Sequence, residues 1–188
     1  MKLKTHYMLS RIASENQSGL SLLQKKAFCI GSLLPDLSPM QFIHRHFYTK
    51  SAKYVFKKLR RLYGKNSLAS MLAYGKMAHY CSDFCCSVHR DGKIGNPSEH
   101  IKYESALEIF AINNKSKIKE CIRKGTNGLK LHEIFNTYNS SLKYNYLYDL
   151  NMALKACSII CAGAVYNKNV SHKTVPFNTG ESNTAEVC

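Results

Sequence analysis

The chain has 188 residues, a length that fits one domain able to bury a substantial core without disulfides or other staples. Its net charge of +15 and sequence pI near 9.5 favour an anionic partner, such as nucleic acid, an anionic membrane surface or a phosphate-bearing substrate. Charge alone does not choose among these three partners.

The N-terminus and the most apolar stretch of the chain indicate where the protein resides. The N-terminus is basic, but no unbroken apolar stretch and no small-residue cleavage site follow it, so we expect no signal peptide. The stretch 147–165 is interrupted by Asp149, Asn151 and Lys155 and is too mixed for a transmembrane helix. We therefore expect a cytoplasmic protein, with at most a peripheral association with a membrane.

Eight cysteines would suggest disulfides in a secreted protein. Without a signal peptide we expect them to be thiols, and most of them to be small core residues. Cys81, Cys85 and Cys86 flank Asp83, and thiolate binds zinc well. A structural zinc site built on these thiols is therefore the alternative, although no paired Cys-x2-Cys motif occurs elsewhere.

Apolar residues recur at three- and four-residue intervals and few alternating β patterns occur, which predicts an all-α fold. In chain order, the first clear element is an amphipathic helix over 20–31. Pro35 should disfavour helix at Leu34 and place Asp36 on a turn.

Two helices are predicted next, and the second of them carries His79 and Asp83. One helix should begin after Ser51, the expected N-cap. Another should cover about 67–88, with an apolar stripe that continues into His79 and Asp83. After a loop rich in glycine and proline, Ser98 is expected to cap the helix that follows.

The C-terminal part is predicted to contain three more helices, at 114–124, 129–142 and 144–167. From residue 168 onward the Asn, Ser, Thr, Gly and Pro content leaves little to bury. We therefore expect a helical domain at 1–167, a flexible tail at 168–188 and no internal repeat.

The densest run of metal-binding residue types reads His79-x3-Asp83-x5-His89-x10-His100-x3-Glu104. Zinc accepts imidazole and carboxylate readily when a catalytic position is kept open. Residues four apart lie on one face of a helix, so each His-x3-acid pair can hold an ion. On a continuous helix His89 would lie roughly 80° around from His79, which suits a second ion better than the first. The spacing predicts a multi-metal cluster in a zinc-dependent hydrolase.

Upstream residues complete an ordered set: His6, then the turn Gly31-Ser32-Leu33-Leu34-Pro35-Asp36, then His46-Phe47-Tyr48. The whole set resembles the zinc-dependent phospholipase C family, which is similar to the single-strand nucleases of the P1/S1 type. The resemblance implies a compact multi-helix domain and two or three zinc ions. It implies one zinc held by Asp36, His46, His79 and Asp83, a second held by His89, His100 and Glu104, and a third held by His6 with Asp83 as a bridge.

The chain departs from that family at its N-terminus. The family completes the third site with the amino group and carbonyl oxygen of an N-terminal tryptophan, and this chain contains no tryptophan. Either the third site is weak or empty, or the backbone of Met1 takes this role, because a main-chain amine needs no particular side chain. His44 could exchange roles with His46, which we prefer because His-Phe-Tyr carries the resemblance. His132 and His172 lie outside the pattern and are expected to bind no metal.

The resemblance implies hydrolysis of a glycerophospholipid to diacylglycerol and a phosphorylated head group, by in-line attack of a zinc-activated water that Asp36 orients or deprotonates. Glu104 and its short spacer favour a lipase, because the similar nucleases tend to carry aspartate after a longer spacer. A nuclease or nucleotide phosphodiesterase is the first alternative and would need bases to stack on Tyr48, Tyr80 or Tyr103. A non-catalytic, zinc-stabilised membrane-surface module is the second alternative. Nucleic acid is thus a less favoured partner than phospholipid or an anionic membrane surface.

Overall fold

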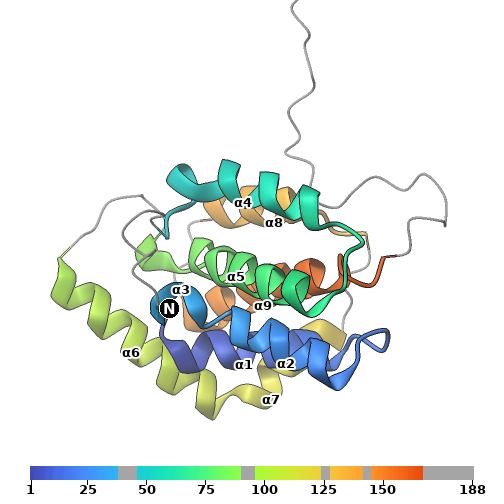
Figure 1. Ribbon diagram of the computed structural model, residues 1–188. Coiled ribbons are helices and arrows are strands. Elements are labelled where there is room, and N and C mark those ends of the chain that lie inside the picture. Colours follow the sequence, from blue (N-terminus) through green and yellow to red (C-terminus); the bar gives the residue numbers. More distant parts are fainter. Residues whose placement is uncertain (38–45, 90–95, 124–127, 142–144, 167–188) are drawn as a thin grey trace, which may run out of the picture.

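The computed structural model describes residues 1–37, 46–89, 96–123, 128–141 and 145–166. Within these ranges every regular element is helical, which confirms the all-α prediction (Figure 1). The elements are α1 (Leu3–Glu15), α2 (Leu22–Gly31), α3 (Leu34–Leu37), α4 (Tyr48–Leu62), α5 (Leu68–Phe84), the 3-10 helix η2 (Ser87–His89), α6 (Pro97–Asn113), α7 (Lys115–Arg123), α8 (Leu131–Ser140) and α9 (Tyr146–Ala162). None of the helices in these ranges is long and apolar enough to cross a membrane.

Helices α5 and α9 form the centre of the fold (Figure 1). α5 packs against α2, α4 and α9, and α9 also packs against α1. Leu150, Leu154, Cys157 and Cys161 of α9 are fully buried. This buried pair of helices provides a fixed platform for the polar side chains at the end of α5.

Two glycines bring α2 and α5 into direct backbone contact. A Cβ at Gly75 would overlap the carbonyl oxygen of Phe28, and a Cβ at Gly31 would overlap the backbone of α5. Glycine at both positions allows this close crossing because it has no side chain. Since α2 leads through Ser32 into α3, the crossing brings Asp36 close to α5.

Several predicted helix starts and ends are wrong. α4 begins at Tyr48 after the extended, buried residue Phe47, so Ser51 is a buried residue within the helix rather than its N-cap. α5 ends at Phe84, and the chain continues as a separate 3-10 turn instead of a helix to residue 88. The N-cap of α4 makes no side-chain cap hydrogen bond, so no capping residue marks this start in the sequence.

Prolines account for two further differences. α6 begins at Pro97, and its N-cap is Asn96, whose side chain accepts the N–H of Ser98, so the predicted Ser98 cap is wrong. Pro35 lies in the first turn of α3, which places Asp36 in a short helix rather than on a turn. In both cases the missing N–H of proline falls where a helix needs none.

Of the remaining helices in the described residues, four were predicted from the sequence and α1 was missed. α2, α7, α8 and α9 occur where they were predicted, with slightly shorter ends. α1 has no predicted counterpart, because its N-cap Lys2 makes no side-chain cap and its first turn has no acidic residue. His44, His172 and the predicted tail at 168–188 lie outside the described residues.

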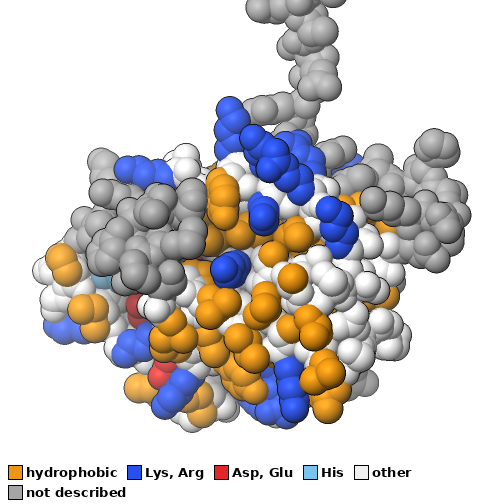
Figure 2. All heavy atoms as spheres, in the orientation of Figure 1, with side chains coloured by type: hydrophobic (Ala, Val, Ile, Leu, Met, Phe, Trp, Pro, Cys, Tyr) orange, Lys and Arg blue, Asp and Glu red, His pale blue; other side chains and the backbone are white. Residues whose placement is uncertain are grey.

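The surface of the described residues is uneven in character. Figure 2 shows lysine and arginine side chains over α4 and hydrophobic side chains over α1, α2 and α5. The exposed aliphatic residues include Leu37, which follows Asp36, and Ile101, which follows His100.

Candidate metal centre

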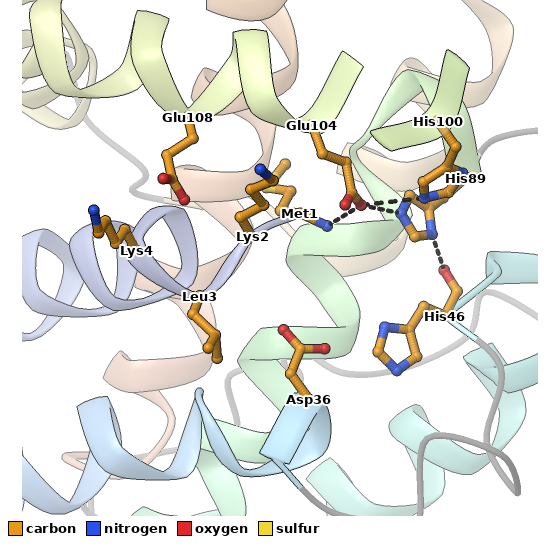
Figure 3. Close-up of a pocket in the computed structure, with 10 residues that line it drawn as sticks. All are labelled: Met1, Lys2, Leu3, Lys4, Asp36, His46, His89, His100, Glu104 and Glu108. Carbon is orange, nitrogen blue, oxygen red and sulfur yellow. Dashed lines mark hydrogen bonds and ion pairs between the residues drawn. The ribbon is translucent and has the colours of Figure 1, made fainter. Parts of the chain in front are cut away.

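The eight predicted ligand residues converge where α1, α3, α5, η2, α6 and the segment before α4 meet. Figure 3 shows Asp36, His46, His89, His100 and Glu104 of this set. Each of three sets has ligand atoms within 4.8 Å of one another: His6, His79 and Asp83; Asp36, His46 and His79; and His89, His100 and Glu104. The first two sets share a histidine, and we call them together the inner cluster. We call the third set the outer cluster.

His79 and Asp83 lie one turn apart on α5 and are fully buried, with His79 Nε2 3.3 Å from Asp83 Oδ2. His79 Nδ1 lies 2.9 Å from the carbonyl oxygen of Ser32. Since a carbonyl oxygen only accepts, Nδ1 carries the hydrogen and Nε2 keeps its lone pair. Nε2 also lies 3.4 Å from Asp36 Oδ1, so the ring is held in the orientation and tautomer of a metal ligand.

The two oxygens of Asp83 face different neighbours. Oδ1 lies 3.3 Å from His6 Nε2 and 2.5 Å from the amine of Met1. Oδ2 lies 2.7 Å from His46 Nδ1 and 3.3 Å from His79 Nε2. One carboxylate can therefore contact two ions at once.

The outer cluster combines η2 and α6. Glu104 Oε1 lies 3.0 Å from His89 Nε2 and 3.2 Å from His100 Nε2 (Figure 3). His89 Nδ1 lies 3.2 Å from the carbonyl oxygen of His46, so here too Nδ1 carries the hydrogen. The Met1 amine lies 2.9 Å from Glu104 Oε1 and thus connects the outer cluster to Asp83.

Distances between ligand atoms test whether zinc fits. Two atoms that both bind a tetrahedral zinc at about 2.0–2.1 Å should be about 3.3–3.4 Å apart. His79 Nε2 lies 3.3 Å from Asp83, 3.4 Å from Asp36 and 3.3 Å from His46. Those contacts match, and the outer contacts of 3.0 and 3.2 Å are slightly shorter. The 2.7 Å between His46 Nδ1 and Asp83 Oδ2 is a hydrogen-bond distance, which a shared zinc would have to lengthen.

The two ring nitrogens of His6 also indicate a metal site. His6 is buried, yet neither ring nitrogen has a hydrogen-bond partner among the described residues. Buried polar atoms without partners are costly, and a metal bond would compensate one of these nitrogens. The residues that converge here therefore fit a zinc site.

The pKa shifts of His79 and Asp83 agree with ligand chemistry. Burial lowers the pKa of His79 well below its usual value, which keeps its ring neutral. Burial alone would raise the pKa of Asp83, but the Met1 ammonium group and nearby imidazoles hold it well below its usual value. Burial disfavours the Met1 ammonium group, yet Asp83 and other nearby groups raise its pKa to about 12, so a metal bond to this amine would have to displace a proton. Neutral imidazole and ionised carboxylate are the forms that bind metal.

Both clusters open onto a pocket of about 590 Å³ (Figure 3). Its lining residues are Met1, Lys2, Leu3, Lys4, Asp36, His46, His89, His100, Glu104 and Glu108. Lys2, Lys4 and Glu108 were not predicted as site residues. A molecule in this pocket can reach ligand residues of both clusters.

A family model described as zinc dependent phospholipase C matches residues 5–157, well over half of the chain. The chain belongs to the zinc-dependent phospholipase C family. No curated protein and no solved structure matched the chain. At the level of the family, the chain is a zinc-dependent phosphodiester hydrolase, and its three sets supply residue types that bind zinc.

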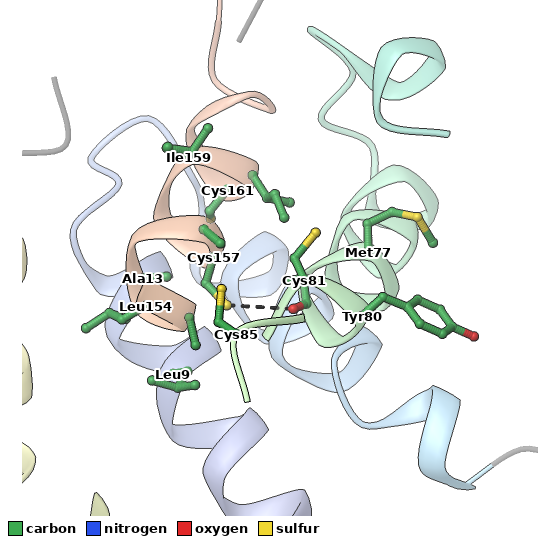
Figure 4. Packing of buried hydrophobic residues seen from close by; sticks show 14 of the residues in the cluster. Leu9, Ala13, Met77, Tyr80, Cys81, Cys85, Leu154, Cys157, Ile159 and Cys161 are labelled. Atoms are coloured by element: carbon green, nitrogen blue, oxygen red, sulfur yellow. Dashed lines mark hydrogen bonds between the residues drawn. The ribbon is translucent and has the colours of Figure 1, made fainter. Parts of the chain in front are cut away.

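Most cysteines in the described part of this phospholipase C family member lie in the core, and Figure 4 shows Cys81, Cys85, Cys157 and Cys161 there. Six of the seven cysteines in the described part of the chain are buried, and all seven are free thiols. Burial raises the pKa of Cys81 and Cys85 well above the usual value, which favours the thiol over the thiolate that zinc requires. None of the candidate ligand sets found in the described residues contains a cysteine, so the cysteine-zinc alternative gains no support.

His132 and Asp149 lie outside the three sets of this family member. His132 lies on α8 and belongs to none of the three sets of described residues. Asp149, treated above only as an interruption of an apolar stretch, is fully buried and contacts the segments that carry His89 and Glu104. A charged residue within an apolar helix was the available signal for a buried polar network.

Proposed function

We propose that this chain hydrolyses a glycerophospholipid to diacylglycerol and a phosphorylated head group. The observation that supports this function best is that both clusters line one open pocket in a member of the zinc-dependent phospholipase C family. The proposed ligands are Asp36, His46, His79 and Asp83 for one zinc, His89, His100 and Glu104 for a second, and His6, Asp83 and the Met1 amine for a third.

Asp36 has the position of a general base. Zinc ions bound in the clusters would offset the charge of the phosphodiester and make water acidic enough to supply a nucleophile near neutral pH. Asp36 lines the pocket and also belongs to the inner cluster, so its carboxylate reaches both the cluster and a bound molecule. Burial raises its pKa, which makes it a stronger base than an exposed aspartate.

The test uses phosphatidylcholine vesicles and single-stranded RNA, each with and without a chelator. We expect chelator-sensitive cleavage of lipid only, and loss of turnover without loss of the fold in Asp36→Asn. Retained activity in Asp36→Asn would reject its role as the base. Cleavage of RNA would favour a nuclease, and no cleavage of either substrate would favour a structural zinc module.

Contacts of three tyrosines support a lipid substrate over nucleic acid. Tyr80 is buried, and Tyr48 packs edge-on against Phe84 with ring centroids 5.5 Å apart. The hydroxyl of Tyr103 donates to Asp149 at 2.7 Å. These rings take part in internal packing and hydrogen bonding, whereas base stacking requires an aromatic face open to the pocket.

We further propose that the mouth of the pocket docks on an anionic lipid surface. Leu3 lines the pocket and is exposed, Leu37 follows Asp36, and Ile101 follows a pocket histidine. These aliphatic side chains can enter the lipid interface. Lys2 and Lys4 line the same pocket, and each lysine near an anionic surface contributes about 1 kcal/mol of attraction.

Two isoleucines of α6 provide a matched test. Ile101 is 60% exposed beside the pocket, whereas Ile112 is 55% exposed on the same helix about 16 Å further along. We expect Ile101→Ser to lower activity on anionic vesicles about tenfold, since it removes about 1.5 kcal/mol of apolar burial. Hydrolysis of soluble bis(p-nitrophenyl) phosphate should not change. Equal losses on vesicles in Ile101→Ser and Ile112→Ser would contradict docking through the pocket mouth.

A further inference from the structure

Asp149 on α9 is a fully buried carboxylate that belongs to neither metal cluster. It accepts hydrogen bonds from the backbone N–H of Ser87 at 2.8 Å and from the Ser87 hydroxyl at 2.9 Å. It also accepts hydrogen bonds from the hydroxyls of Tyr103 and Tyr138, each at 2.7 Å. Four donors satisfy the buried charge, and one side chain thereby joins η2, α6 and α8 to α9.

Two of the residues that donate to Asp149 are close in sequence to ligands of the outer cluster. Ser87 begins the three-residue helix η2, which ends at His89. Tyr103 directly precedes Glu104 on α6. Asp149 therefore attaches both segments that supply the outer cluster to the same point on α9.

These two segments have few apolar anchors of their own. η2 is a single turn, and the buried residues of α6 are Leu107 and Ala111, which both follow Glu104 in the sequence. The ring of Tyr103 packs against Tyr146, with centroids 5.0 Å apart. The ring contact and the hydrogen bond of Tyr103 thus hold the part of α6 that Leu107 and Ala111 do not.

Stability alone does not account for a carboxylate at this position. Replacing a buried charged network by apolar residues of similar volume is often neutral or stabilising, because it removes the desolvation penalty. Directional hydrogen bonds, in contrast, fix the distance between the groups that make them. We propose that Asp149 is a positioning residue that sets the separation of His89 and Glu104 and thereby the zinc affinity of the outer cluster. This inference rests on the proposed function, in which the outer cluster binds zinc.

Tyr103→Phe and Tyr138→Phe form a matched pair of variants. Each removes one hydroxyl that donates to Asp149 at 2.7 Å and keeps the aromatic ring. Only Tyr103 adjoins a ligand of the outer cluster, since α8 carries none of the ligand residues. A purely structural network would respond to both substitutions alike, whereas a positioning role distinguishes them.

The measurement is a zinc titration of the full chain against a chromogenic chelator, with Glu104→Gln used to identify the ion of the outer cluster. We expect Tyr103→Phe to weaken that ion about 10- to 100-fold, as loss of groups that orient ligands typically does, and Tyr138→Phe to change its affinity less than about twofold. Thermal unfolding of the zinc-free protein should respond similarly in both variants, because each loses a 2.7 Å hydrogen bond to Asp149.

The outcomes separate the inference from the function on which it rests. Equal weakening of the outer ion in both tyrosine variants, or no weakening in either, would overturn the positioning role. A wild-type chain that binds no zinc through Glu104 would overturn the outer metal site and the inference together. Asp149→Asn, which we expect to weaken the outer ion at least as much as Tyr103→Phe, is a second variant; unchanged outer affinity in it would also overturn the role.

Discussion

Helices α5 and α6 offer the same ligand spacing in opposite surroundings. Both have 17 residues, and each carries a histidine followed four residues later by an acid: His79 and Asp83 on α5, and His100 and Glu104 on α6. α5 has eleven buried residues, whereas α6 has two. The α5 pair is 0% exposed, while the α6 histidine and acid are 21% and 16% exposed.

The difference shows that ligand spacing and ligand rigidity are separate properties. Spacing on a helix brings two side chains to one point, but the packing of the helix decides how firmly they are held there. On α5 the core, the close glycine crossing with α2 and the carbonyl of Ser32 all hold the ligands. On α6 a few hydrogen bonds hold the ligands instead. We therefore expect the outer ion to exchange more readily than the inner ions.

The largest effect is expected for Asp83→Asn in the inner cluster. Both oxygens of Asp83 face ligand partners, so loss of its charge should remove metal from the whole inner cluster. We expect a fall in phosphodiesterase activity of about 1000-fold or more. Zinc per chain and the rate on vesicles are the measurements, and His132→Gln on α8 is the control. An Asp83→Asn protein with normal zinc content would contradict the inner site.

Glu104→Gln should have a smaller effect, because it affects the outer cluster alone. We expect loss of one zinc ion and a fall in activity of about 100-fold, with the inner ions retained. The matched control is Glu108→Gln, one turn further along α6 and also in the pocket lining. If Glu104→Gln removed all the zinc, the division into two clusters would be wrong.

A still smaller effect is expected for the Met1 amine, which contacts Asp83 of the inner cluster and Glu104 of the outer cluster. A Gly-Ser extension before Met1 would move the amine from its place between Asp83 and Glu104. We expect reduced zinc content and a fall in activity of about tenfold, since one metal ligand is lost. The same two residues added after Cys188 form the control. Equal zinc content in the two extended proteins would reject a role for the amine.

Removal of the metal should test the difference between α5 and α6 without any substitution. Because α6 has only two buried residues, we expect a chelator to raise hydrogen exchange severalfold in 97–113. The amides of α5, which lie in the core, should change much less. Exchange measured by mass spectrometry with and without chelator checks this, and a uniform increase in both helices would show that the two are equally dependent on metal.

Only part of the predicted ligand set follows from helical spacing, namely His79 with Asp83 and His100 with Glu104. His6, Asp36 and His46 were predicted from the resemblance to the phospholipase C family. The sequence also separated His89 from His79, but for a different reason from the one that the structure shows. A continuous helix would have turned His89 away, whereas α5 in fact ends at Phe84 and η2 follows. The end of α5 lacks any proline or glycine that would have marked it.

Other features depend on contacts between distant segments and could not be predicted from spacing. The role of Asp149 requires α6, α8 and η2 all to lie around α9, and a single apolar stretch does not report that arrangement. The place of the Met1 amine depends on α1, whose start has none of the usual capping signals. Local patterns thus predicted which residues have ligand chemistry but not what holds them.

His46 belongs to the inner cluster and also contacts the outer one, since its ring faces Asp83 and its carbonyl oxygen accepts a hydrogen bond from His89. A metal bond to the ring in one cluster would restrain the backbone that orients a ligand of the other. The two binding equilibria are then linked thermodynamically, and any linkage must be reciprocal: the factor by which the inner ion changes outer affinity equals the factor by which the outer ion changes inner affinity. Zinc loading of this chain should therefore be cooperative rather than a sum of independent events.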